Sequence, residues 1–380
     1  MIPAGFDAID EAVLVALIHG GVAEGRTLEF KRQLPGGSND DKKEFLADVT
    51  AMANSQGGDL VYGLDEANGV ASTLPGLLDD RDMALNRLES LLRDGVEPRL
   101  TGARLGWVSL ASGAGAVVIR VPPSPAAPHR ITLNNSGKFF ARNSGGKYEM
   151  DTHELRQAFS ASEALPERLR ALHREAVLSA TTGVNLPFRV HDEPMAVVSI
   201  IPYGVLRETR DFEVTPENAL APIRATEFEP LHLIEGVLLH SPLNAGSPEG
   251  SNFNSVRSYA LTHRRGRIDI AWTIGGTRDF GGISPTQLVW PGRFEDGLKE
   301  AVVHGIPRLR QLGVEGPWLI AASVSGLADH HLITGRGLFS DAAWRDGAML
   351  GELLIDQPSA DLAPLLNAFW LAFGVPRQAQ

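Results

Sequence analysis

A predicted helix followed by two consecutive glycines and an apolar strand constrains the fold of this chain more than any other stretch. Asp40 or Asp41 can cap the helix, whose apolar side chains recur at helical spacing on one face. Gly57 and Gly58 come after it, and glycine readily adopts the positive φ at which helices end. The mostly apolar residues 60–64 then predict a short strand in the interior of a sheet.

A short charged strand precedes this helix. If residues 27–30 are extended, Glu29 and Lys31 lie on one face, where Lys31 can pair with that carboxylate or with a phosphate. Glu24 lies five residues before Glu29, and residues five apart on a straight strand face opposite sides. The two carboxylates therefore converge only if the chain bends at Gly25, which glycine permits.

The remaining patterns of the first half predict further helices and short strands. Apolar residues at helical spacing predict helices over residues 7–20, 81–93 and 151–160. Extended runs predict strands at residues 101–110, 116–121, around 131 and 138–142.

A domain boundary is expected near Pro166, within the polar stretch 160–167. We place a first domain at residues 1–162 and a separate C-terminal α+β domain of sensory or regulatory role at residues 163–380. In this second domain the sequence predicts helices at 166–178, 294–312 and 362–373, strands at 195–201 and 317–324, and a hairpin of 255–262 with 267–272. Five tryptophans are expected in its core, namely Trp272, Trp290, Trp318, Trp344 and Trp370.

Composition narrows the class of protein. A length of 380 residues favours two domains, and the absence of cysteine excludes disulfides, thiol catalysis and thiolate metal sites. No apolar window is long enough for a membrane span and the N-terminus lacks a signal-peptide pattern, so we expect a cytoplasmic protein without a membrane partner. A formal charge of −11 argues against a general nucleic-acid coat, although a local groove of Arg and Lys can still hold a phosphate backbone.

The first domain resembles the AlbA-like (AlbA_2) domain of Schlafen proteins and of their bacterial relatives over about residues 20–160. The carrying motifs are the Glu24 to Lys31 segment with its Leu-Glu-Phe-Lys, the helix end Ala-Asn-Ser-Gln-Gly-Gly at 53–58, and the strand with its end at 59–66. Ala127 to His129 and Phe140 to Asn143 match later strands of the family. The resemblance implies an α+β fold in which a mixed sheet has flanking helices.

The resemblance also implies a metal-dependent endoribonuclease, acting on RNA such as tRNA in bacterial antiviral or stress defence. Ribonucleases of the family use three carboxylates, which on this sequence are Glu24, Glu29 and position 66, with Lys31 as a further catalytic candidate. The family has Asp-Asp at the strand end, whereas this chain has Asp65 and Glu66, so either can be the third ligand. Such an oxygen donor set suits Mg²⁺ or Mn²⁺.

The remaining expectations concern His129, ATP hydrolysis, the oligomeric state and the cations that contact nucleic acid. His129 is a candidate substrate contact or acid, although a lone histidine is more often structural. No Walker lysine follows the glycines, which argues against ATP hydrolysis. Family nucleases pair two such lobes, so a homodimer is expected. The cations expected to contact nucleic acid are Arg26, Arg130, Lys138, Arg142 and Lys147.

Two alternatives remain open from the sequence. The first is a non-catalytic regulator that binds RNA or DNA, in which the carboxylates lie too far apart to share an ion. The second is an adaptor that acts through its C-terminal domain, which agrees with the acidic composition.

Overall fold

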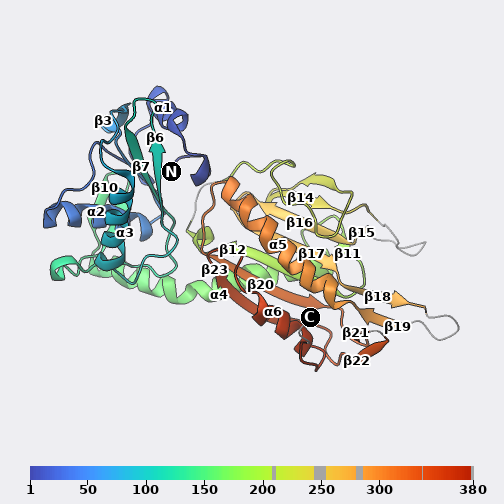
Figure 1. Cartoon of the computed structure of the whole chain (residues 1–380). Helices are drawn as coiled ribbons and strands as arrows, with labels where there is room; N and C mark the ends of the chain where they lie inside the picture. The colour runs from blue at the N-terminus through green and yellow to red at the C-terminus, as the bar shows by residue number, and fades with distance from the viewer. Residues whose placement is uncertain (208–210, 244–253, 280–285, 336, 378–380) are drawn as a thin grey trace. The chain divides into compact units, whose positions relative to one another are not determined.

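The computed structural model describes the chain except for residues 208–210, 244–253, 280–285, 336 and 378–380 (Figure 1). The chain divides into two compact units. Unit 1 comprises Met1–Pro166 with Tyr203–Thr209 and Gly313–Gly316, and unit 2 comprises Glu167–Pro202, Arg210–Leu312 and Pro317–Gln380. Both units combine helices with sheets, so the predicted α+β class is confirmed.

A four-stranded mixed sheet forms the centre of unit 1. The order is β1 (Leu28–Lys31), β2 (Gly58–Tyr62), β7 (Gly115–Val121) and β6 (Arg104–Ser109), with β1 parallel to β2 and the other pairs antiparallel. Because side chains alternate along β2, Leu60 packs with α2 (Asn39–Ala53) and α3 (Arg81–Gly95), while Val61 packs with α1 (Glu11–His19). Unit 1 therefore has a core on each face of its sheet.

Short hairpins and single turns surround this sheet. The hairpins pair β3 (Asp65–Ala67) with β4 (Val70–Thr73), and β9 (Phe140–Asn143) with β10 (Gly146–Glu149). A smaller ladder joins β5 (Val96–Glu97) to β8 (Arg130–Ile131), and the 3₁₀ turns are η1 (Phe6–Ala8), η2 (Leu133–Asn135) and η3 (Tyr203–Leu206).

Two predicted details of unit 1, the N-cap of α2 and the role of Gly58, differ from the structure. Ser38, rather than Asp40 or Asp41, caps α2, because its hydroxyl accepts the N–H of Asp41 while the two aspartates occupy the first turn. Gly57 has a φ of 74° as expected, but Gly58 instead begins β2. A Cβ on Gly58 would lie 2.9 Å from the carbonyl oxygen of Thr27, so that position also excludes a side chain.

The two helices predicted on either side of Pro166 are in fact one helix, α4 (Thr152–Thr182). Proline removes one backbone hydrogen bond from a helix and is destabilising there. Leu165 and Leu169 nevertheless continue one buried stripe across the proline, and this burial favours an unbroken helix. The prediction of a helix break at this proline was therefore wrong.

Unit 2 is built on a seven-stranded antiparallel sheet. Helix α5 (Pro291–Gln311) lies along this sheet in Figure 1. Gly305 of this helix lies so close to Ile200 of the sheet that a Cβ at Gly305 would collide with it. Val197 lies on the same strand as Ile200 but points to the opposite face of the sheet, where it packs with Ala176 of α4. The strands in order are β13 (Glu229–His232), β14 (Gly236–His240), β16 (Ser258–His263), β17 (Ile268–Thr273), β12 (Met195–Pro202), β20 (Trp318–Ser325) and β23 (Ala348–Ile355).

The other elements of unit 2 are shorter. Strands β16 and β17 confirm the predicted hairpin. A four-stranded sheet has the order β18 (Gly275–Arg278), β19 (Thr286–Val289), β21 (His331–Gly335) and β22 (Leu338–Ala342). A separate pair joins β11 (Arg189–Val190) to β15 (Ser255–Val256). Helix α6 (Ala363–Leu371) contacts β23. Among the described residues, no helix combines the length and the apolar character that crossing a bilayer requires.

The tryptophan prediction holds for Trp272, Trp318 and Trp370, which are buried, but it was wrong for Trp344. The side chain of Trp344 is 75% exposed. The guanidinium of Arg345 lies 4.1 Å from its ring centroid, so a cation–π contact covers a face of the ring instead of the core.

A fully buried ion pair joins the two central strands of unit 1. Asp59 on β2 lies opposite Arg120 on β7, and Arg120 Nε donates to Asp59 Oδ1 at 2.8 Å. The same guanidinium donates to the carbonyls of Ile2 and Ala4, while Asp59 Oδ2 accepts the N–H of Ile2. The N-terminal segment is thus bound to the centre of the sheet.

We predict that Arg120→Met lowers the free energy of unfolding by about 3–5 kcal/mol, because it leaves the Asp59 carboxylate buried without its partner. Urea unfolding of the full chain measures the change. Arg93→Met is the control, since Arg93 pairs with Asp94 at the exposed surface and its loss should leave stability essentially unchanged. Equal stability of the two variants would contradict a structural role for the buried pair.

Candidate functional site

The chain bends at Gly25, as the sequence argument required. The N–H of Gly25 donates to the carbonyl of Leu28 at 3.0 Å, which closes a tight turn before β1. The Glu24 carboxylate then reaches along the strand, where its Oε1 accepts the N–H of Phe30 at 2.7 Å. This contact brings Glu24 next to Glu29.

Glu66 comes to the same place from the β3–β4 hairpin. The N–H of Glu24 donates to the carbonyl of Gly69 at 2.7 Å, and the Glu66 carboxylate accepts the N–H of Gly69. Asp65 is directed elsewhere, because its carboxylate accepts from Arg32 at 2.9 Å. Of the two acidic residues at this strand end, the structure therefore groups Glu66 with Glu24.

Glu29 is held by two cations. Lys31 Nζ lies 2.6 Å from Oε1, and the guanidinium of Arg142 donates to Oε2. Arg142 comes from β9 and also donates to the carbonyl of Gly25 at 2.7 Å, and only 2% of its side chain is exposed. Arg142, a candidate for phosphate binding, is thus an internal contact of the strand edge in this arrangement.

Asp48 on α2 lies in the same charged cluster as Glu29 and Lys31, which the sequence patterns did not predict. Its carboxylate lies 2.8 Å from Lys147 Nζ and 4.0 Å from Lys31 Nζ, and its side chain is 1% exposed. Lys147 also pairs with Glu44. The available signal was an aspartate inside the apolar run of residues 45–53, where a charge is costly unless a partner compensates it.

The pKa values of the carboxyl groups reflect these surroundings. Burial, together with the nearby charges of Glu29 and Glu66, raises the pKa of Glu24. Burial also acts to raise the pKa of Glu29, but hydrogen bonds from Lys31 and Arg142 outweigh it and lower that pKa. For Asp48, burial exceeds the attraction of Lys147 and raises the pKa. Glu24 therefore retains a proton more readily than Glu29 does.

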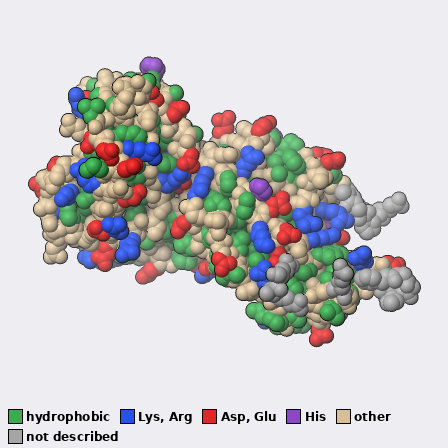
Figure 2. Space-filling model, viewed as in Figure 1, with side chains coloured by type: hydrophobic (Ala, Val, Ile, Leu, Met, Phe, Trp, Pro, Cys, Tyr) green, Lys and Arg blue, Asp and Glu red, His purple; other side chains and the backbone are tan. Residues whose placement is uncertain are grey.

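The other three cations predicted to contact nucleic acid, Arg26, Arg130 and Lys138, lie at the exposed surface. Arg130 pairs with Glu97, and Lys138 pairs with Glu149, each at 2.6 Å on the exposed surface. Arg26 is exposed, and no ion pair of its own is found within the described part of the chain. Figure 2 shows acidic and basic side chains interspersed over the visible face of unit 1, consistent with such pairing.

Two residues of the family motifs, Asn54 and His129, have structural roles. Asn54 at the end of α2 donates to the carbonyls of His129 and Phe140 and accepts the N–H of His129. The His129 ring is fully buried between the carbonyl of Pro98 and the hydroxyl of Ser124, and burial lowers its pKa. His129 therefore has no access to a substrate in this structure.

The carboxylates do not fit a divalent metal ion in this arrangement. Within the described residues, no three His, Asp or Glu side chains are placed to hold one. Both oxygens of Glu29 are engaged by cations, and one oxygen of Glu66 accepts a backbone N–H. The donor chemistry suits Mg²⁺ or Mn²⁺, but the geometry does not.

Two hollows of unit 1 share Arg87 in their walls, and the first of them begins at the end of β1. One, of about 580 Å³, is lined by residues 32–36, 75–79 and Arg87. The other, of about 670 Å³, shares Arg87 and lies along α3 and the start of α2, with Lys42 in its wall. Arg32, Lys42 and Arg87 thus line one concave surface, together with Asp79 and Asp94.

We predict that Glu24→Gln changes how stability depends on pH. The folded-state pKa of Glu24 is raised from its ordinary value of 4.5, so the folded state binds this proton more tightly than the unfolded state. The free energy of unfolding therefore falls as the pH rises from 4.5 through the raised pKa. Glutamine can still accept the Phe30 hydrogen bond but cannot ionise, so that fall should be absent in the variant.

Urea unfolding of both proteins between about pH 4 and pH 7 tests this expectation. The difference in stability should shift in favour of Glu24→Gln as the pH rises. Glu89→Gln, at an exposed position of α3, is the control and should follow the wild-type curve. Parallel curves for Glu24→Gln and wild type would show that the Glu24 carboxyl is not perturbed.

Comparison with known proteins matches residues 24–151 to the family model described as Schlafen, AlbA_2. One similar solved structure is the DIP2311 protein from Corynebacterium diphtheriae, at 17% identity and a TM-score of 0.28, over 39% of this chain and 28% of that one. Another is the N-terminal domain of an ATP-dependent DNA helicase RecG-related protein from Nitrosomonas europaea, at 18% identity and a TM-score of 0.29, over 38% of this chain and 97% of that one.

No curated protein matches the chain. The family match covers the Glu24 turn, the α2 end with Asn54 and the strand end at Glu66. Residues 24–151, about a third of the chain, are therefore similar to the Schlafen, AlbA_2 domain, as the sequence motifs predicted.

Proposed function

We propose that unit 1 binds RNA along the concave surface beside β1. The observation that carries the proposal is the placement of Arg32, Lys42 and Arg87 around two adjoining hollows. The three cations come from the loop after β1, from α2 and from α3, so they line a path rather than one point. A ligand with repeating phosphates matches such a path.

The charges of these cations are only partly compensated by other groups. Arg32 pairs with Asp65 but is 65% exposed, and Arg87 is exposed and donates to the carbonyl of Pro35. With a formal charge of −11, the chain repels a polyanion elsewhere, so binding depends on this local surface. An RNA backbone in the hollows would displace water and counterions rather than break buried ion pairs.

The binding test is fluorescence anisotropy of the full chain with a labelled structured RNA and a DNA of the same sequence. The double variant Lys42→Gln with Arg87→Gln should weaken binding by about tenfold or more. The magnitude of the slope of log affinity against log salt concentration should fall by roughly 1.4 to 1.8, because two phosphate contacts are lost. Tighter binding of the DNA would assign the surface to DNA.

The double variant Lys43→Gln with Arg81→Gln is the matched control for this experiment. Lys43 lies on α2 with Lys42, and Arg81 lies on α3 with Arg87, but neither lines a hollow, so the control removes the same two charges from the same two helices. It should bind RNA as the wild type does. If the control and the variant of Lys42 and Arg87 weaken binding equally, net charge rather than this surface accounts for the affinity, and the proposal fails.

A second candidate function, metal-dependent endoribonuclease, is favoured by the position of the Glu24 carboxylate, which lies near Glu29 on β1 and near Glu66. In the structure Glu29 pairs with Lys31 and Arg142. To bind a metal ion, the Glu29 carboxylate would have to release one of these two cations. Lys31 would then be available to a phosphate oxygen of the substrate. Cleavage of tRNA and a paired, homodimeric assembly belong to this second candidate.

Incubation of tRNA with the pure full chain and millimolar Mg²⁺ or Mn²⁺, with a chelator as blank, tests cleavage. Glu24→Gln and Glu66→Gln should abolish it, and Asp65→Asn should reduce it less, because Asp65 pairs with Arg32 instead of joining the trio. The exposed Glu89→Gln serves as control. RNA that stays intact with the wild type, or is cut equally by Glu24→Gln, would remove this candidate and leave RNA binding standing.

A further inference from the structure

A small cavity in unit 2 gathers three arginines around the start of α5. Its volume is about 210 Å³. Within the described residues its wall contains no acidic side chain, and it is formed by Ile223, Arg224, Arg257, Ser258, Trp272, Thr273 and Arg293. Figure 2 shows Lys and Arg side chains gathered over the part of unit 2 where Figure 1 labels β11, β15 and β17.

Arg293 is held firmly in this wall. It lies in the first turn of α5, with its guanidinium 4.1 Å from the centroid of the Trp290 ring. Its backbone carbonyl accepts the indole N–H of Trp272 at 3.0 Å, and Trp272 itself is buried. A cation fixed on an aromatic face at a helix start loses little freedom when it binds an anion.

The other two arginines come from different segments. Arg257 lies between β15 and β16, where its carbonyl accepts the N–H of Thr273 and its side chain lies 3.4 Å from Glu193. Arg224 lies in the loop before β13 with a φ of 60°. Three arginines from separate segments thus line one cavity, and guanidinium groups that act together suit a tetrahedral oxyanion.

Basic side chains predominate among the described residues that line the cavity. Its wall contains three arginines, and Glu193, which pairs with Arg257, is not part of the wall. Burial, then the charge of Arg224 and, more weakly, that of Arg257, lowers the pKa of Arg293, which reflects like charges in proximity. Helix α5 also starts without a side-chain cap or an acidic residue in its first turn, so its N-terminus adds partial positive charge.

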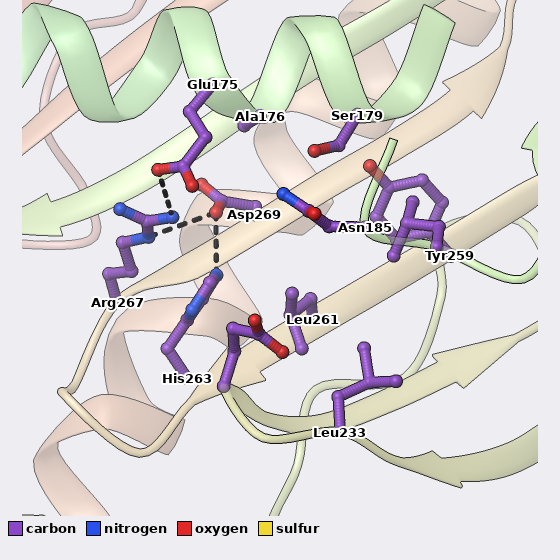
Figure 3. Close-up of a pocket in the computed structure, with 12 residues that line it drawn as sticks. Glu175, Ala176, Ser179, Asn185, Leu233, Tyr259, Leu261, His263, Arg267 and Asp269 are labelled. Carbon is purple, nitrogen blue, oxygen red and sulfur yellow. Dashed lines mark hydrogen bonds and ion pairs between the residues drawn. The ribbon is translucent and has the colours of Figure 1, made fainter. Parts of the chain in front are cut away.

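Another cavity of unit 2 shows the opposite arrangement (Figure 3). It measures about 40 Å³, and its acidic residues, Glu175, Glu235 and Asp269, outnumber its one arginine. Asp269 accepts from His263 at 2.7 Å and from Arg267 at 3.1 Å, and Arg267 also pairs with Glu175. These ion pairs lower the pKa of Asp269 despite its burial. The contrast shows that the arginine excess of the first cavity is not a general property of unit 2.

We propose that the cavity of Arg224, Arg257 and Arg293 binds the phosphate or diphosphate group of a small phosphorylated ligand. A wall with three arginines and, among the described residues, no acidic side chain suits the negative charge of a phosphate monoester near neutral pH. The cavity is open on one side, so the remainder of the ligand can extend out of it. The hydroxyls of Ser258 and Thr273 supply further donors.

Isothermal titration of the full chain with inorganic phosphate and with pyrophosphate tests the proposal at constant ionic strength. We expect saturable binding, and we expect Arg293→Gln and Arg224→Gln each to weaken it by about tenfold or more. Lys299→Gln is the matched control, because it removes one exposed charge from α5 outside the cavity and should bind as the wild type does.

Two further outcomes complete the test. Equal competition by sulfate would show a general oxyanion site and overturn the assignment to phosphate. Absence of saturable heat with both phosphate probes, or unchanged affinity in both arginine variants, would overturn the site itself. Because Arg224 is exposed, its variant should keep the wild-type melting temperature in phosphate-free buffer, which separates lost binding from lost folding.

Discussion

The buried ion pair of Asp59 and Arg120 is the contact on which unit 1 depends most. It lies between the two central strands, and it also binds the backbone of residues 2–4 to the sheet. Two charges without solvent are tolerated only when every oxygen and N–H finds a partner, and here the backbone supplies the missing ones. The central register is thereby set, and with it the position of β1, whose Leu28 lies beside Asp59.

The same register determines which side chains of β1 form the charged edge at the candidate site. Leu28 and Phe30 enter one core, so Glu29 and Lys31 face the other side of the sheet. There Asp48 of α2 and Lys147 of β10 complete an alternating series of charges. Carboxylates gathered without cations would repel one another, and Lys31 and Arg142 relieve that repulsion at Glu29. The same arrangement that makes the residues resemble a reaction centre therefore stabilises them without a metal ion.

Local patterns predicted the fold of unit 1 well, because helix periodicity, glycine at Gly57 and the apolar run of β2 depend on near neighbours. The bend at Gly25 was predicted as a condition, and the structure satisfies it. What could not be predicted are contacts across the chain: that Arg142 would be buried against Glu29, that Asp48 would join the cluster, and that Ser38 would cap α2. The arginine cavity of unit 2 likewise depends on three segments far apart in sequence.

The outward edge of β1 is closed by side chains rather than by another strand. The N–H of Phe30 is taken by the Glu24 carboxylate, and the carbonyl of Leu28 is taken by Gly25 and Arg142. Unpaired edge strands invite sheet-to-sheet association and aggregation, and charged residues that occupy the edge groups prevent it. An assembly of two copies therefore cannot extend this sheet through β1 unless Glu24 and Arg142 first release the strand, so self-association by strand addition is blocked at the candidate site.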